Sequence, residues 1–167
     1  VKEIDSSAFS NCNSLTEIII PNNVVSIGEN AFSYCTNLEN IVLSENITGI
    51  NYKVFSNCKK LQTIIIPDGV KYIGGAAFIS CVSLKNIIIP DSVDYISSNS
   101  LSGCINIESI TMPYNQNLPS ILGASKWTTP TGMPESLKTV VMTNCTNIFN
   151  QTFYGCDYIT DITLGKY

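Results

Sequence analysis

Cysteine is the residue type in this chain with the greatest capacity for chemistry. The chain has seven cysteines and no histidine among its 167 residues. Cysteines form disulfides, bind metals or act as nucleophiles when the thiol is deprotonated. No two cysteines have the C-x-x-C spacing of a zinc site, and histidine, the usual additional ligand, is absent. We therefore expect neither a bound metal nor a cofactor.

The spacing of the cysteines indicates a structural role instead. Six recur at equivalent places in a repeat: Cys12, Cys35, Cys58, Cys81, Cys104 and Cys156. Equivalent cysteines on neighbouring repeats lie within disulfide reach by Cα distance, but their side chains point the same way rather than at each other. We expect a ladder of small, buried, reduced thiols, with Cys145 set apart from it.

Acid–base catalysis has few candidate residues. The most frequent general base, histidine, is missing, and the sequence has no glycine-rich phosphate loop or serine nucleophile motif. Glu17 and Glu39 are expected on adjacent strands, at a separation that glycosidases use. They fall in different columns of an open sheet, however, where nothing excludes water. The sequence therefore predicts no enzyme.

A repeat of 23 residues must position all these side chains, and it is clearest from Leu61 to Cys81. It reads L-x-x-I-x-I-P-x-x-V-x-x-I-x-x-x-A-F-x-x-C. A fixed period of this length indicates a solenoid, in which each unit packs only against its neighbours. One phenylalanine per unit is expected inside the coil, in a row formed by Phe9, Phe32, Phe55, Phe78 and Phe153.

The two halves of each unit predict different structures. The first half is rich in β-branched residues and usually ends at proline, so it predicts a strand. Seven such strands should form one parallel sheet of a right-handed coil, centred on Ile18, Ile41, Ile64, Ile87, Ile110, Val140 and Ile162. The second half has a V-x-x-I spacing that is too short for a helix. It predicts short turns or 3₁₀ segments and leaves open a second sheet of short strands.

This pattern resembles the BspA-like, or treponemal-type, leucine-rich repeats over nearly the whole chain. The resemblance implies a leucine-rich repeat solenoid, with residues 1–167 forming one domain of about seven units. It also implies an extracellular or cell-surface location and an adhesion function toward a host matrix protein, a cell-surface protein or a glycan. Because both ends of the sequence fall inside a unit, we expect a fragment of a longer array.

The strand face that points away from the core carries the candidate binding residues. Strand alternation places two columns there. The first is polar and includes Asn40, Thr63 and Asn86; the second is an apolar stripe of Ile19, Val42, Ile65 and Ile88. Contiguous exposed apolar patches usually mark contact sites, although β-propensity alone also favours Ile and Val in strands. Two functions stay open: a module that binds a protein or glycan on a concave sheet, and a structural spacer with no ligand of its own.

An irregular insertion interrupts the repeat at residues 114–136. It lacks the A-F-x-x-C motif, begins with Tyr114 and contains the only tryptophan, Trp127. Long irregular insertions are usually functional or mobile. Two interpretations stay open: a binding loop whose aromatic residues wall one end of the sheet, and a variant repeat in which Trp127 fills a gap.

Charge and hydropathy exclude two kinds of partner. The net charge is −4, with only nine Lys and Arg residues, whereas nucleic-acid binding requires clustered basic residues. No apolar run approaches the ~20 residues of a membrane span. We expect no nucleic-acid partner and no membrane insertion by this segment.

Overall fold

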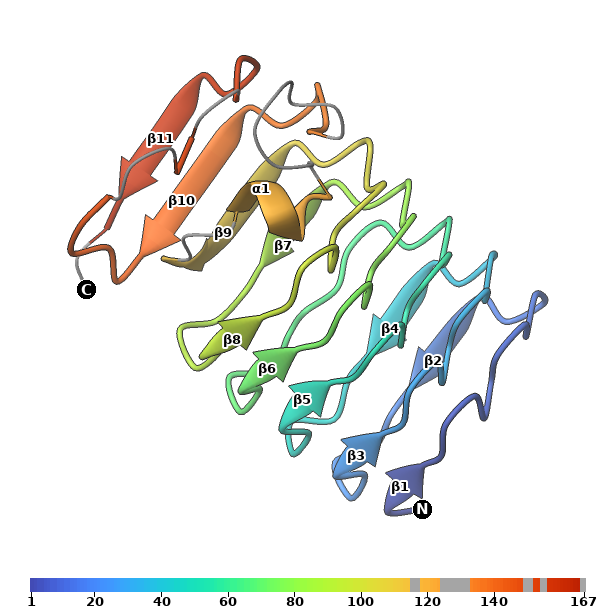
Figure 1. Cartoon of the computed structure of the whole chain (residues 1–167). Coiled ribbons are helices and arrows are strands. Elements are labelled where there is room, and N and C mark those ends of the chain that lie inside the picture. Colours follow the sequence, from blue (N-terminus) through green and yellow to red (C-terminus); the bar gives the residue numbers. More distant parts are fainter. Residues whose placement is uncertain (115–117, 124–132, 149–151, 154–155, 166–167) are drawn as a thin grey trace.

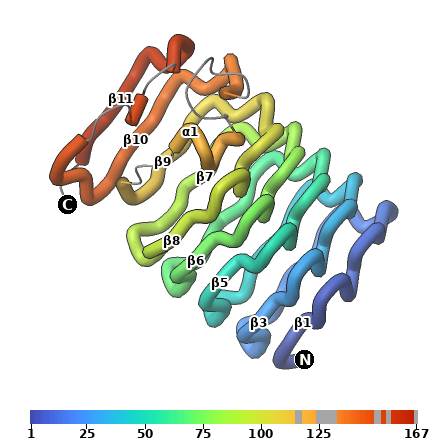
Figure 2. The backbone as a smooth tube through the Cα atoms, viewed as in Figure 1, coloured from blue at the N-terminus to red at the C-terminus, as the bar shows by residue number. Residues whose placement is uncertain are grey.

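The computed structural model describes residues 1–114, 118–123, 133–148, 152–153 and 156–165. Over these residues the chain winds into a solenoid whose turns stack in sequence order from the N-terminus to the C-terminus (Figures 1 and 2). Longer strands follow one side of the coil and short strands the other (Figure 1). The predicted parallel solenoid of 23-residue units is confirmed.

The first half of each unit builds one side of the coil, which we call the long-strand face. Its strands are β2 (Glu17–Ile19), β4 (Asn40–Val42), β7 (Asn86–Ile88), β9 (Ser109–Pro113), β10 (Thr139–Thr143) and β11 (Asp161–Leu164). Paired strands run parallel with equivalent residues of successive units side by side, as in the Asn86–Ser109 pair. Six of the seven expected strands are present. The third, expected around Ile64, is reduced to a single bridge between Ile65 and Ile88.

The long-strand face is open between the second and third turns. No backbone hydrogen bond joins residues 40–43 to residues 63–66, all of which are described. In the equivalent places of other turns, the N–H of Ile20 donates to Val42 O at 2.9 Å and that of Ile89 to Thr111 O at 2.8 Å. The N–H of Leu43 makes no such bond to Ile65. The third turn is therefore attached to the second chiefly through the rest of the coil.

Short strands close the opposite side of the coil. They are β1 (Glu3–Ile4), β3 (Ser26–Ile27), β5 (Gly49–Ile50), β6 (Tyr72–Ile73) and β8 (Tyr95–Ile96). They form two parallel sheets, β1-β3 and β5-β6-β8. A side chain joins these two sheets, since Asn51 Nδ2 donates to Ile27 O at 2.7 Å. At the equivalent place one turn later, the backbone N–H of Gly74 donates to Ile50 O instead. The second sheet that the sequence left open is thus present.

Stacked phenylalanine rings fill the centre of the coil. Ring centroids of successive units lie 5.1, 5.8 and 5.5 Å apart from Phe9 through Phe32 and Phe55 to Phe78. The three rings after Phe9 are fully buried. Phe9 and Phe153 are only half-buried, so the prediction that all five rings are buried is wrong for these two. Both lie in end turns of the coil, where fewer neighbouring turns cover them.

The cysteines form a hydrogen-bonded ladder beside the rings. Each buried thiol donates to the carbonyl of the phenylalanine 26 residues earlier, with Sγ···O distances of 3.1 to 3.2 Å. All seven cysteines are free thiols. The four buried members of the ladder are Cys35, Cys58, Cys81 and Cys104. The prediction of six buried thiols is wrong for Cys12, which is exposed, and Cys156, which is half-buried, because end turns give them less cover.

Burial suppresses ionisation along this ladder. Loss of hydration raises the pKa of Cys35, raises that of Cys58 to about 12 and raises that of Cys81 well above its usual value. Burial also raises the pKa of Cys156 to about 11. Since the thiolate is the reactive form, these cysteines are chemically inert at neutral pH.

Two positions in each corner take up the left-handed backbone conformation. The first series is Ser7, Asn30, Lys53, Ala76 and Asn99, and the second is Asn11, Tyr34, Asn57, Ser80 and Gly103. Only one of these ten residues is glycine, although a side chain costs free energy in this conformation. The corner amides point at the next turn, and that of Tyr34 donates to Ser56 O at 2.7 Å. Stacking of the turns thus maintains the unfavourable backbone.

The described part of the insertion continues the coil. The short helix α1 (Leu118–Ile121) takes the place of a corner, since the N–H of Leu101 donates to Ile121 O at 2.9 Å. Leu118, Ile121 and Leu122 are buried in the core. This part of the insertion therefore acts as a variant repeat. Trp127 lies outside the described residues.

We expect the left-handed corner to respond oppositely to glycine at two adjacent alanines. Ala76 has a φ of 54°, whereas Ala77 has no positive φ and is fully buried. Ala76→Gly should raise the free energy of unfolding by up to about 1 kcal/mol by removing the left-handed penalty. Ala77→Gly, the matched control, should lower it by about 1 kcal/mol. Urea titration of both variants measures this. Equal destabilisation would contradict the assigned corner geometry.

Thiol reactivity tests the cysteine ladder. In denaturant without reductant, Ellman's reagent should count seven thiols. In the native protein at pH 8, Cys12 should react rapidly and Cys58 should not, because a pKa of about 12 leaves roughly one thiol in ten thousand ionised. Peptide mass mapping of the labelled sites distinguishes the two. A count of five or fewer in denaturant would reveal a disulfide, and rapid native labelling of Cys58 would contradict its burial.

Candidate binding surface

The apolar stripe lies on the exposed side of the long-strand face. Its four side chains are 75% (Ile19), 56% (Val42), 84% (Ile65) and 66% (Ile88) exposed. Their strand neighbours point inward, as Ile87 and Ile89 show by their burial. The alternation inferred from the sequence therefore places the stripe in water.

A polar column runs beside the stripe. Asn40, Thr63 and Asn86 are all exposed on the same face. Asn86 Oδ1 accepts a hydrogen bond of 2.6 Å from the Ser109 hydroxyl on the next strand. The face thus offers hydrogen-bonding groups along one flank of an apolar centre.

Two grooves flank the side chain of Ile65, where the strand ladder is open. The larger has a volume of about 830 Å³ and is lined by five isoleucines of the third and fourth turns, by Pro90 and by polar residues that include Thr111. The smaller, of about 570 Å³, lies toward the second turn and includes Val42 and Leu43. Ile65 lines both grooves, so the most exposed residue of the stripe forms the ridge between them.

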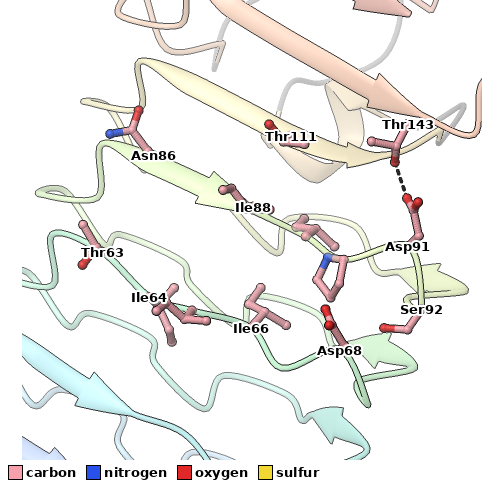
Figure 3. Close-up of a pocket in the computed structure, with 13 residues that line it drawn as sticks. Thr63, Ile64, Ile66, Asp68, Asn86, Ile88, Asp91, Ser92, Thr111 and Thr143 are labelled. Atoms are coloured by element: carbon pink, nitrogen blue, oxygen red, sulfur yellow. Dashed lines mark hydrogen bonds between the residues drawn. The ribbon is translucent and has the colours of Figure 1, made fainter. Parts of the chain in front are cut away.

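Carboxylates edge the grooves where the strands end. Asp68 and Asp91 line the larger groove, and Glu45 and Asp68 line the smaller. Figure 3 shows Asp68 and Asp91 beyond Ile66 and Ile88, at the end of the groove opposite Thr63 and Asn86. The Thr143 hydroxyl donates a hydrogen bond to Asp91 Oδ1.

We did not predict this acidic edge, although the sequence contains a repeated pattern that indicates it. In three consecutive units an acidic residue directly follows the residue that ends the strand: Ser44-Glu45, Pro67-Asp68 and Pro90-Asp91. The spacing of 23 residues places the three carboxylates in one column.

Two carboxylates at the opposite end of the strands have lysine partners. Lys60 Nζ lies 3.5 Å from Glu39 Oε1, and Lys85 Nζ lies 3.3 Å from Glu108 Oε1. Both pairs are exposed and join neighbouring turns. Among the described residues, Glu45, Asp68 and Asp91 at the carboxyl ends of the strands have no such lysine partner.

Of the two aromatic residues considered as a wall of this face, Tyr114 lies in the described part. The Tyr114 side chain is half-buried against the core, with its hydroxyl 3.3 Å from Thr152 Oγ1. Its backbone N–H donates to Thr143 O at 3.0 Å. Of the two interpretations left open for the insertion, these contacts of Tyr114 favour the variant repeat, because its side chain packs on the core and reaches Thr152. Trp127 is not among the described residues.

The described residues offer no metal centre. No three His, Cys, Asp or Glu side chains in them lie close enough together to bind an ion. Of Glu17 and Glu39, considered above as a catalytic pair, Glu17 is exposed, and Glu39 is partly exposed and pairs with Lys60. Among the helices of the described chain, none has the length and apolar character of a membrane span.

The fold and its repeat define the class of protein. A parallel solenoid with one strand per 23-residue turn on a single face is a leucine-rich repeat architecture. Six copies of the BspA type leucine rich repeat region match residues 2–121 and 133–167. The chain belongs to the BspA-type leucine-rich repeat family.

Solved structures of bacterial proteins share this fold. The T. pallidum leucine rich repeat protein is 25% identical over 99% of this chain, with a TM-score of 0.68. A leucine rich cell surface protein from Faecalibacterium prausnitzii A2-165 is 38% identical over 66% of this chain, with a TM-score of 0.65. The matches span 64% and 29% of those two chains, so this chain corresponds to less than two thirds of either. Comparison with curated proteins gives no match.

Proposed function

We propose that this chain is a cell-surface or secreted adhesion module that binds a protein or glycan partner on its long-strand face. The observation that carries the proposal is the apolar stripe, in which four consecutive turns each expose a large aliphatic side chain. An isoleucine that is 84% exposed removes little apolar area from water, so it contributes little to folding. Burial against a partner would give this stripe a favourable free energy.

The structural relatives support the proposed location. The F. prausnitzii protein that is 38% identical to this chain is a leucine rich cell surface protein. An extended face repeated over several turns also suits a ligand larger than a metabolite, because binding contacts are then spread along the coil.

The alternative function is a structural spacer, which would not require an apolar stripe on this face. A spacer needs stacked turns but gains nothing from an exposed apolar column, which promotes nonspecific association. The stripe and the grooves beside Ile65 therefore favour binding over simple extension.

We predict that Ile65→Glu combined with Ile88→Glu removes adhesion while the fold persists. Both side chains already face water, so the free energy of unfolding should change by no more than about 1 kcal/mol. The measurement is retention of beads coated with the protein on basement-membrane extract and on epithelial cell layers. Retention should fall to background, because charge replaces the apolar contact.

A matched control adds the same two charges on the other side of the coil. Val25→Glu combined with Tyr95→Glu alters two exposed residues near the short strands, and retention should stay at the parent level. Equal retention of the parent and the Ile65/Ile88 variant would contradict the proposal. So would a parent that is not retained at all, which is the behaviour of a spacer.

A further inference from the structure

We propose that the partner contacts this face with a basic amphipathic helix, whose apolar side lies along the stripe and whose Lys or Arg residues meet the acidic edge. This inference rests on the proposed function and specifies the chemistry of the partner. It follows from the juxtaposition of an apolar groove with a row of carboxylates, and each part can be derived from the described residues.

The groove supplies the apolar part of the site. The exposed side chains of Ile65 and Ile88 line it, together with the buried Ile66 and Ile89 and with Pro90. Its volume of about 830 Å³ is large enough for several side chains of a protein segment. Because the strand ladder is open beside Ile65, the surface is furrowed rather than flat and can receive side chains on both sides of that residue.

The carboxylates determine the sign of the partner's charge. Among the described residues, no lysine lies within ion-pair distance of Glu45, Asp68 or Asp91, whereas lysines pair with Glu39 and Glu108 at the other end of the strands. The three carboxylates are exposed in the free protein. A cationic flank on the partner would complement this edge and orient the partner across the strands. The net charge of −4 favours association with a basic segment in the same way.

The repeat spacing favours a helix over an extended strand. Carboxylates on successive turns are separated by roughly the rung spacing of a parallel sheet, ~4.8 Å. Residues four apart on a helix surface lie ~5–6 Å apart, whereas alternate residues on one side of an extended strand lie ~6.6 Å apart. A row of lysines at every fourth position of a helix would therefore keep nearly in step with Glu45, Asp68 and Asp91. Its neighbouring apolar row would follow the stripe.

The test uses a fluorescein-labelled synthetic helix of leucine and lysine, with leucine on one side and lysine at i, i+4 spacing on its flank. Fluorescence anisotropy measures its Kd for the folded protein. Asp68→Asn combined with Asp91→Asn keeps the size and hydrogen-bonding oxygen of both side chains but removes two charges. We expect the Kd to rise about fivefold or more, and the difference from the parent to shrink as salt is added.

Two controls make the result specific to this edge. Glu29→Gln combined with Asp94→Asn removes two exposed charges on the short-strand side and should change the Kd less than twofold. A peptide in which every lysine is replaced by glutamate should not bind the parent. Equal effects of the two double variants would mean general charge attraction and would overturn the inference.

The remaining outcomes separate this inference from the proposed function. If Ile65→Glu with Ile88→Glu abolishes adhesion to matrix or cells but Asp68→Asn with Asp91→Asn does not weaken the peptide, the face binds a partner of other chemistry, such as a neutral glycan. The inference then fails and the proposed function stands. If the parent does not bind the lysine peptide, the inference is wrong regardless of adhesion. If neither pair of substitutions affects either assay, both proposals fail.

Discussion

The 23-residue register governs the contacts that hold this solenoid together. Phenylalanine rings stack on their equivalents in the neighbouring turns, buried thiols donate to the phenylalanine carbonyl of the preceding turn, and corner amides donate to the following turn. Because each contact joins equivalent places in adjacent turns, a change in one turn must be matched or absorbed by its neighbours. The inward columns therefore repeat the same residue types, and even a left-handed corner is occupied by residues as unsuited to it as Tyr34 and Lys53.

At three places a contact that repeats between the other turns is missing, and the coil compensates for it. Where the backbone bond after Ile27 is missing, the Asn51 side chain replaces it. Where the corner motif is lost after Leu101, helix α1 provides both the carbonyl and the apolar side chains that the stack requires. The opening beside Ile65 is tolerated for another reason, since the short strands β5 and β6 and the corners keep the second and third turns together. The side chains of the outward apolar stripe take no part in these ring, thiol and corner contacts, so the stacking does not determine their residue types.

The sequence reveals columns of identical residues but not the contacts that depend on backbone conformation. Phe55 and Cys58 are legible because their types recur, and the face of Ile65 follows from strand alternation. The left-handed corners are hidden because their residue types vary from Ser7 to Ala76. The opening of the ladder falls in the most regular unit of the chain, so no local pattern marks it. The sequence left the place of Tyr114 open, because the residue that its hydroxyl contacts, Thr152, is 38 residues away.

Hydrogen exchange tests most directly whether the backbone hydrogen bonds of the long-strand face are interrupted beside Ile65, where the grooves form. Leu43 and Ile89 are equivalent, buried residues, yet only the N–H of Ile89 donates to the next turn. The free energy of one hydrogen bond corresponds to as much as about a tenfold difference in protection. NMR-detected exchange should therefore show Leu43 exchanging up to about ten times faster than Ile89. Equal protection of the two amides would mean that the strand ladder is continuous, and the groove between the second and third turns would not exist as described.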